Sequence, residues 1–153
     1  MPHILATTLI AVLSLSALVA PPSFAAGTSD GSSAATPEAG YTQAKAAVDA
    51  GKYTTALPIL VMLTKDDPKN ADAWNLLGFT DRMLGQNAES SAAYLKVLAI
   101  NPNHLGALEY QGELFIQTGK LDQAQANLAK LKALCGTCEQ VGDLTKALKA
   151  AGV

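Results

Sequence analysis

The stretch that decides the fold is residues 71–104, ADAWNLLGFTDRMLGQNAESSAAYLKVLAINPNH. Gly85 lies near its middle, and glycine takes the left-handed conformation that ends a helix without the steric penalty of a Cβ atom. Pro102 lies near its end, and the residue before a proline is pushed out of the α-helical region of backbone conformation. The stretch therefore predicts two antiparallel helices, of which the first ends at Gly85 and the second ends before Pro102.

The same pattern recurs along the chain with a period of 34 residues. The positions in phase are Gly51, Gly85 and Gly119; Lys52, Gln86 and Lys120; Ala56, Ser90 and Ala124; and Leu60, Tyr94 and Leu128. Pro68 and Pro102 obey the same period, and Gly136, another helix terminator, stands where a third proline would fall. A fixed period of this length is typical of a repeat architecture in which each unit is one helix pair.

Small residues also recur in phase, in the middle of the first helix of each pair: Ala44, Gly78 and Gly112. A glycine inside a helix costs roughly 1 kcal/mol relative to alanine, so its presence there needs a reason. We expect the reason to be close approach by the second helix of the pair at its own small residues, Ala56, Ser90 and Ala124.

The pattern predicts an all-α chain. The expected helices span 38–50, 54–66, 72–84, 88–100, 105–118, 122–134 and 139–150. Thr36 and Pro37 favour the first of these starts, as a side-chain cap and as a proline at the first helical position. No stretch alternates apolar and polar residues as a half-buried strand would.

The middle unit resembles the tetratricopeptide repeat (TPR) through Trp74, Leu77, Gly78, Tyr94 and Pro102. It departs from that pattern at Asp81, where the repeat has tyrosine, and at Ser90, where it has alanine. The resemblance implies a short right-handed solenoid of three helix-turn-helix units over residues 37–70, 71–104 and 105–138. The last helix, within residues 139–153, is expected to cap the third unit with an apolar face made of Val141, Leu144, Ala147 and Leu148.

In the TPR family the first helices of successive units line a concave groove that takes an extended peptide or a partner helix. Carried over to this chain, the groove residues are Tyr41, Lys45, Val48, Asp72, Asn75, Phe79, Arg82, Glu109, Glu113 and Ile116. Exposed aromatic side chains often dominate binding energy, so Tyr41 and Phe79 are candidate anchors, although both could simply pack against neighbouring helices. The resemblance implies an adaptor or assembly factor that binds another protein or peptide.

The first 25 residues have the pattern of a secretory signal peptide. The apolar run from Ile4 to Ala20 precedes a small-residue stretch, and we expect cleavage near Ala25. An uncleaved anchor is the alternative, because the stretch before the run carries no lysine or arginine. We expect residues 26–36 to form a flexible leader and the mature chain to be periplasmic or secreted, without stable membrane insertion.

The two cysteines, Cys135 and Cys138, lie between the third unit and the last helix. In an exported protein two cysteines this close are expected to form a disulfide, and we interpret it as a structural clamp on that corner. A thiol-disulfide exchange site and a metal bridge between two chains are the alternatives. Haem attachment needs a histidine directly after the second cysteine, where this chain has Glu139.

Nothing in the sequence predicts catalysis or a bound cofactor or metal. Motifs for a nucleophile elbow, a phosphate loop or a metal-binding helix are missing, and we expect His104 to be a solvent-facing linker residue. The formal net charge of −2 comes from scattered charges, which gives no reason to expect nucleic-acid binding. The apolar residues that we assign to the core are Trp74, Leu77, Leu98, Leu128 and Leu131.

Overall fold

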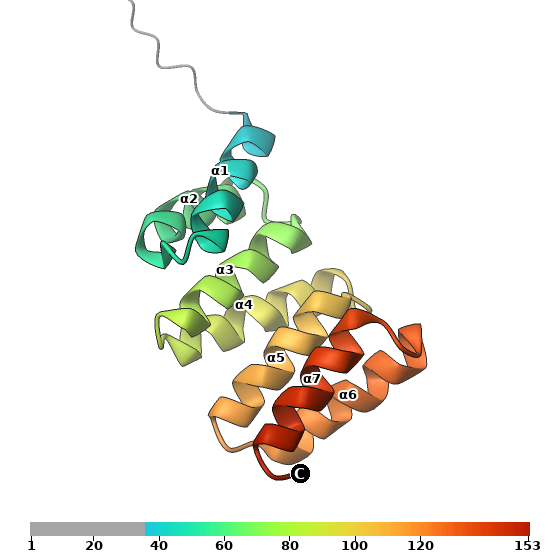
Figure 1. The fold of residues 1–153 in the computed structure, drawn as a ribbon. Helices are drawn as coiled ribbons and strands as arrows, with labels where there is room; N and C mark the ends of the chain where they lie inside the picture. The colour runs from blue at the N-terminus through green and yellow to red at the C-terminus, as the bar shows by residue number, and fades with distance from the viewer. Residues whose placement is uncertain (1–35) are drawn as a thin grey trace, which may run out of the picture. The chain divides into compact units, whose positions relative to one another are not determined.

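The structure is a computed structural model that describes residues 36–153, and almost all of the expected signal peptide and leader lies outside the described residues. The described part is all-α and contains no strand. Its helices are α1 (Pro37–Asp49), α2 (Tyr53–Asp66), α3 (Ala71–Met83), α4 (Asn87–Ile100), α5 (Leu105–Gln117), α6 (Leu121–Cys135) and α7 (Glu139–Ala150). Figure 1 shows these helices in chain order. Every helix end lies within one residue of its predicted position.

The turns between paired helices form where the glycines predict them. Gly51, Gly85 and Gly119 have φ angles of 69°, 76° and 74°, in the left-handed region that favours glycine. The helix starts are capped by side chains at Thr36 and Asn70, which accept hydrogen bonds from the backbone N–H groups of Ala39 and Ala73. Local sequence signals therefore account for these turns and for the starts of α1 and α3.

Close approach of paired helices occurs at Gly78. The Ser90 hydroxyl group donates a hydrogen bond to the Gly78 carbonyl oxygen across 2.8 Å, and a Cβ atom at Gly78 would lie 2.7 Å from the Tyr94 ring. Gly112 has a different neighbour from the one expected, because a Cβ atom there would lie 2.6 Å from the side chain of Leu144 in α7. Glycine at position 112 therefore makes room for the last helix.

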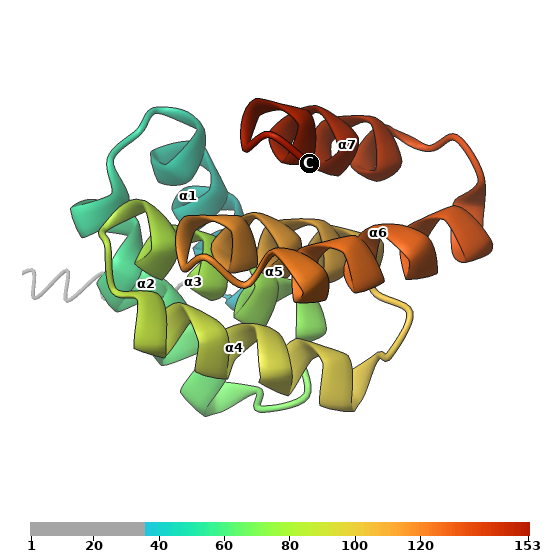
Figure 2. The same cartoon turned by 90° about the horizontal axis from the view of Figure 1, so that it is seen from below.

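The helices form two rows along the solenoid (Figure 2). The inner helices, α1, α3, α5 and α7, each contact the next inner helix. Among the described residues, no Cα atom of one outer helix (α2, α4 or α6) lies within 8 Å of a Cα atom of another. The inner row is therefore the tightly packed side, whereas the outer row is splayed.

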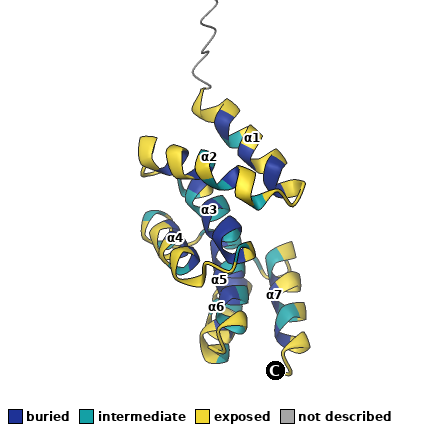
Figure 3. Ribbon diagram, turned by 90° about the vertical axis from the view of Figure 1, so that its left-hand side faces the viewer, coloured by how far each residue is buried: buried dark blue, intermediate teal, exposed yellow. Residues whose placement is uncertain are grey.

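The apolar core runs along the solenoid between these rows (Figure 3). Of the residues assigned to it, Leu77 and Leu131 are buried, and Trp74, Leu98 and Leu128 are partly buried against the clusters. Val141, Leu144 and Leu148 of α7 are buried in the same cluster as Leu108 of α5 and Leu131 of α6. The last helix therefore covers the third unit as predicted. No helix within residues 36–153 has the length and apolar character that crossing a membrane requires.

Candidate partner-binding surface

Two hollows lie between neighbouring inner helices. The first, which we call the N-terminal hollow, has a volume of about 270 Å³ and lies between α1 and the start of α3. Its lining residues are Pro37, Glu38, Tyr41, Asn70 and Asp72. The C-terminal hollow, between α5 and α7, has a volume of about 360 Å³ and is lined by Glu109, Glu113, Asp143, Lys146, Ala147 and Ala150. Four of the predicted groove residues therefore line hollows: Tyr41, Asp72, Glu109 and Glu113.

Phe79 lies between the two hollows and is packed rather than free. Its ring centroid is 6.2 Å from that of Tyr53 in α2 and 5.0 Å from that of Tyr110 in α5. The Arg82 guanidinium group lies 5.3 Å from the Phe79 centroid and also pairs with Glu113. Arg82 is only 9% exposed, and its ion pair with Glu113 neutralises its charge within the fold. Arg82 is therefore engaged within the fold in this conformation.

The other predicted groove residues differ in their access to solvent. Val48 is 7% exposed and belongs to the core, so it cannot reach a partner in this conformation. Lys45 is exposed and pairs with Asp49 one turn along the same helix, an interaction that is weak in water. Asn75 and Ile116 are partly buried, and Ile116 packs against the C-terminal core cluster.

One carboxyl group of the C-terminal hollow, that of Glu109, has a raised pKa. Burial, together with the nearby charges of Glu113, Asp143 and Glu139, raises the pKa of Glu109 to about 7, although Arg82 acts in the opposite direction. Glu109 is 6% exposed, so water stabilises its charged form poorly. Acidic groups outnumber basic ones around this hollow, and a cation placed there would relieve their repulsion.

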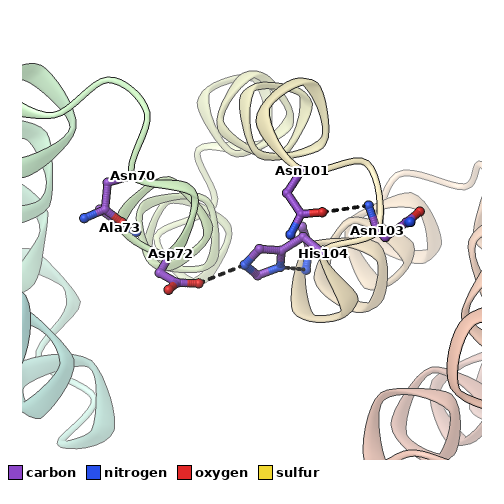
Figure 4. A network of polar contacts seen from close by, with 7 residues as sticks. Asn70, Asp72, Ala73, Asn101, Asn103 and His104 are labelled. Carbon is purple, nitrogen blue, oxygen red and sulfur yellow. Dashed lines mark hydrogen bonds and ion pairs between the residues drawn. The ribbon is translucent and has the colours of Figure 1, made fainter.

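His104 is not the solvent-facing residue that the sequence predicts (Figure 4). Its side chain is 14% exposed, and its Nε2 atom lies 3.0 Å from the Asp72 carboxylate of the preceding unit. Its Nδ1 atom accepts a hydrogen bond from the backbone N–H group of Ala107. Nδ1 therefore carries no proton, and Nε2 donates to Asp72. His104 caps α5 and ties that helix to α3, which is a structural role.

Sequence reasoning missed several residues of this surface. Tyr53 and Tyr110 enclose Phe79, and Asp143 and Lys146 complete the C-terminal hollow from α7. One signal in the sequence could have indicated Asp143 and Lys146. The last helix follows the third unit at the same 34-residue period, so it takes the place that the first helix of a fourth unit would have in the inner row.

Cys135 and Cys138 form a disulfide in the structure, at the corner between α6 and α7. Both cysteines are partly buried against the C-terminal core cluster. Within residues 36–153, no three or more His, Cys, Asp and Glu side chains gather closely enough to hold a metal ion.

Comparison with known sequences adds to this geometry. A family model described as the tetratricopeptide repeat matches residues 41–78, which run from α1 into α3. The chain therefore contains a tetratricopeptide repeat. It is also 33% identical, over 76 residues, to a Vibrio cholerae protein described as a "putative beta-barrel assembly-enhancing protease". That match covers 48% of this chain and only 16% of the length of that protein.

Several solved TPR structures have the same fold. The first TPR domain of Spaghetti (RPAP3), bound to an HSP90 peptide, superposes with a TM-score of 0.67 at 17% identity, over 76% of this chain and 94% of that one. The Yersinia enterocolitica type III secretion translocator chaperone SycD gives a TM-score of 0.68 at 20% identity, over 76% and 92% of the two chains. MamA gives 0.65 at 19% identity, over 78% of each. These likenesses establish the TPR solenoid.

Proposed function

We propose that this TPR protein is an interaction module that binds a peptide or a helix of another protein on its inner helices. One observation carries the proposal: four residues named from the TPR resemblance, two at each hollow, line hollows between neighbouring inner helices. Phe79 and its aromatic neighbours form the surface between these hollows. A ligand that lies along the inner helices could contact all three places.

Related structures support this use of the fold. The RPAP3 domain is bound to an HSP90 peptide, and the CopN–Scc3 complex, which matches with a TM-score of 0.62, is an assembly of two named proteins. The Vibrio cholerae relative is described as a protease, but the match covers a small part of it. We therefore propose a binding role for this chain and no catalytic one.

The charges of the C-terminal hollow favour a basic group on the partner. Glu109, Glu113 and Asp143 line it, against the single cation Lys146. Arg82 lies nearby but is already paired with Glu113. We expect a lysine or arginine of the partner to occupy this end of the surface, because it would offset the repulsion among the carboxylates.

The expected signal peptide supports a role outside the cytoplasm. We propose that residues 1–25 are removed and that the mature chain acts in the periplasm or after secretion, as an adaptor or assembly factor. The intact mass of the protein recovered from its native host tests this directly. A mass that includes Met1 would contradict cleavage.

Surface charge reversal tests the binding role without disturbing the core. We expect Asp143→Lys to lower the yield of a partner captured from the native host, because it removes an acidic group from the C-terminal hollow. Asp122→Lys, on exposed α6, is the matched control and should leave the yield unchanged. Equal capture by the native protein and Asp143→Lys would count against this surface. Phe79 and Arg82 are poor test sites, because both are packed into the fold.

The cysteine pair distinguishes a structural role from a redox one. We propose that the disulfide holds the corner between α6 and α7, since both cysteines pack against the core there. Replacing Cys135 and Cys138 together with serine should then lower the melting temperature slightly and leave partner capture intact. A short loop of this kind contributes about 2 kcal/mol or less. Loss of capture with an unchanged melting temperature would instead favour thiol-disulfide exchange.

A further inference from the structure

One cavity of the described chain lies on the opposite side from the inner-helix surface. It is a groove of about 810 Å³ between the outer helices α2 and α4, with α3 as its floor. Both α2 and α4 pack on α3, but their backbones stay more than 8 Å apart at the Cα atoms, and this splay leaves the space open. We call it the outer groove.

Most of the outer groove is apolar. Its floor is formed by Trp74 and Leu77 of α3, and its walls include Leu57 and Val61 of α2 and Ala93 of α4. Val61 is 49% exposed although it is a large aliphatic residue. Figure 3 shows broad exposed faces on α2 and α4. A partner that covered these side chains would gain from removing apolar surface from water.

One carboxylate lies inside this apolar groove. Asp81 is 4% exposed and lines the groove, and within residues 36–153 its side chain makes no hydrogen bond and no ion pair. A buried charge of this kind is costly unless it is paired. Asp81 also occupies the position at which the repeat pattern has tyrosine. The groove therefore contains a charged group that the fold itself leaves without a counterion.

The charges at the two ends of the groove are opposite. Asp81 lies at one end beside Gln86, whose backbone N–H group donates to the Asp81 carbonyl oxygen across 2.8 Å, and Glu89 lies one turn farther along α4. Lys65 and Lys96 line the groove farther along α2 and α4.

Trp74 marks the lysine end, because its indole N–H group donates to the Pro68 carbonyl oxygen just beyond Lys65. Trp74 and Asp81 are two turns apart on α3, a distance of about 10 Å. The groove is thus acidic at one end, basic at the other and apolar between.

We infer that the outer groove binds an amphipathic segment of a partner protein that carries a lysine or arginine at one end of an apolar stretch and an acidic residue about two helical turns away. The basic side chain pairs with Asp81, the apolar side chains cover Trp74 and Leu77, and the acidic residue meets Lys65 and Lys96. This site is separate from the inner-helix surface, and neither proposal depends on the other.

The test uses two blocked helical peptides of alanine and leucine. The two peptides differ at one position near one end, which is lysine in the first peptide and norleucine in the second. Both peptides carry a glutamate about two helical turns from that position. Binding is followed by the fluorescence of Trp74, the only tryptophan of the chain and a residue of the groove floor. We expect the lysine peptide to bind the native protein about tenfold more tightly than the norleucine peptide, since one charged hydrogen bond distinguishes them.

The Asp81→Asn variant should bind both peptides with equal affinity, whereas the exposed-site control Asp122→Asn should keep the native preference for lysine. Circular dichroism of each variant checks that the helices are intact. Equal binding of the two peptides by the native protein would overturn the inference, as would a lysine preference that persists in Asp81→Asn or a fluorescence signal that does not saturate by about 1 mM. The peptide comparison on the native protein stands even if a variant fails to fold.

Discussion

Two single residues, Asp81 and Glu109, tie the stability of this protein to pH. Burial, helped by the charge of Glu89, raises the pKa of Asp81 from 3.8 to about 6. Burial and its acidic neighbours raise the pKa of Glu109 from 4.5 to about 7. In both cases the folded state holds a proton more tightly than the unfolded state does. The resulting stabilisation is fully present below the unfolded pKa and is lost as the pH rises through the folded pKa.

We therefore expect the free energy of unfolding to fall between about pH 4 and pH 8, by roughly 1–3 kcal/mol for each group, because one pKa unit corresponds to about 1.4 kcal/mol. Urea unfolding at a series of pH values measures this. Asp81→Asn should flatten the part of the curve between about pH 4 and 6, and Glu109→Gln the part between about pH 4.5 and 7. A native protein whose stability rises over this range would contradict the assignment.

Gly78 shows how one missing side chain lets two helices pack. A Cβ atom at this position would lie 2.7 Å from the Tyr94 ring, which is itself fully buried. We expect Gly78→Ala to destabilise the protein by about 1–3 kcal/mol, as overpacking of a core does. Thermal unfolding measures the change.

Gly142→Ala is the matched control for this substitution. Gly142 also lies inside a helix, but a Cβ atom there meets nothing within 4 Å. The higher helix propensity of alanine should therefore raise stability by up to about 1 kcal/mol. If both variants melted alike, close packing at Gly78 would not be the reason for its glycine.

At the scale of elements, α7 decides whether the third unit has a covered face. Leu144 is fully buried, and its side chain packs against α5 where Gly112 has no Cβ atom. We expect Leu144→Ala to cost about 2–5 kcal/mol, the usual range for truncating a core leucine. Chemical denaturation of the variant measures this cost.

Leu134→Ala provides the comparison, because Leu134 is 39% exposed on α6 and its truncation should cost much less. Deletion of residues 139–153 should lower the melting temperature more than either substitution, since it removes all the contacts of α7 with α5 and α6. A truncated protein that melts at the native temperature would refute the capping role.

At the scale of the whole molecule, stability depends on neighbouring units shielding one another. Each unit of a solenoid contacts mainly the next, so about three are needed before a continuous core forms. A fragment of residues 71–153 keeps two units and the cap but loses the contacts of α2 with α3. We expect it to lose cooperative thermal unfolding, which circular dichroism would detect.

Much of the fold could be predicted locally. The helix ends lie where Gly51, Gly85 and Gly119 predict them, because a glycine with positive φ or a proline after a helix acts within one or two turns of chain. The 34-residue period then specified that like units stack, since a single helix pair leaves its apolar face uncovered. These features follow from the sequence because their causes are short-range.

Tertiary structure alone decided which side chains stay accessible. Phe79 and Arg82 have the spacing of groove residues, yet the aromatic rings of Tyr53 and Tyr110 and the carboxylate of Glu113 engage them. Helical periodicity fixes which face of a helix a residue lies on, but its exposure depends on how closely the next unit packs. The inner row is tight and buries part of the expected groove, whereas the outer row is splayed and opens a groove around Asp81, and no spacing along the chain encodes that difference.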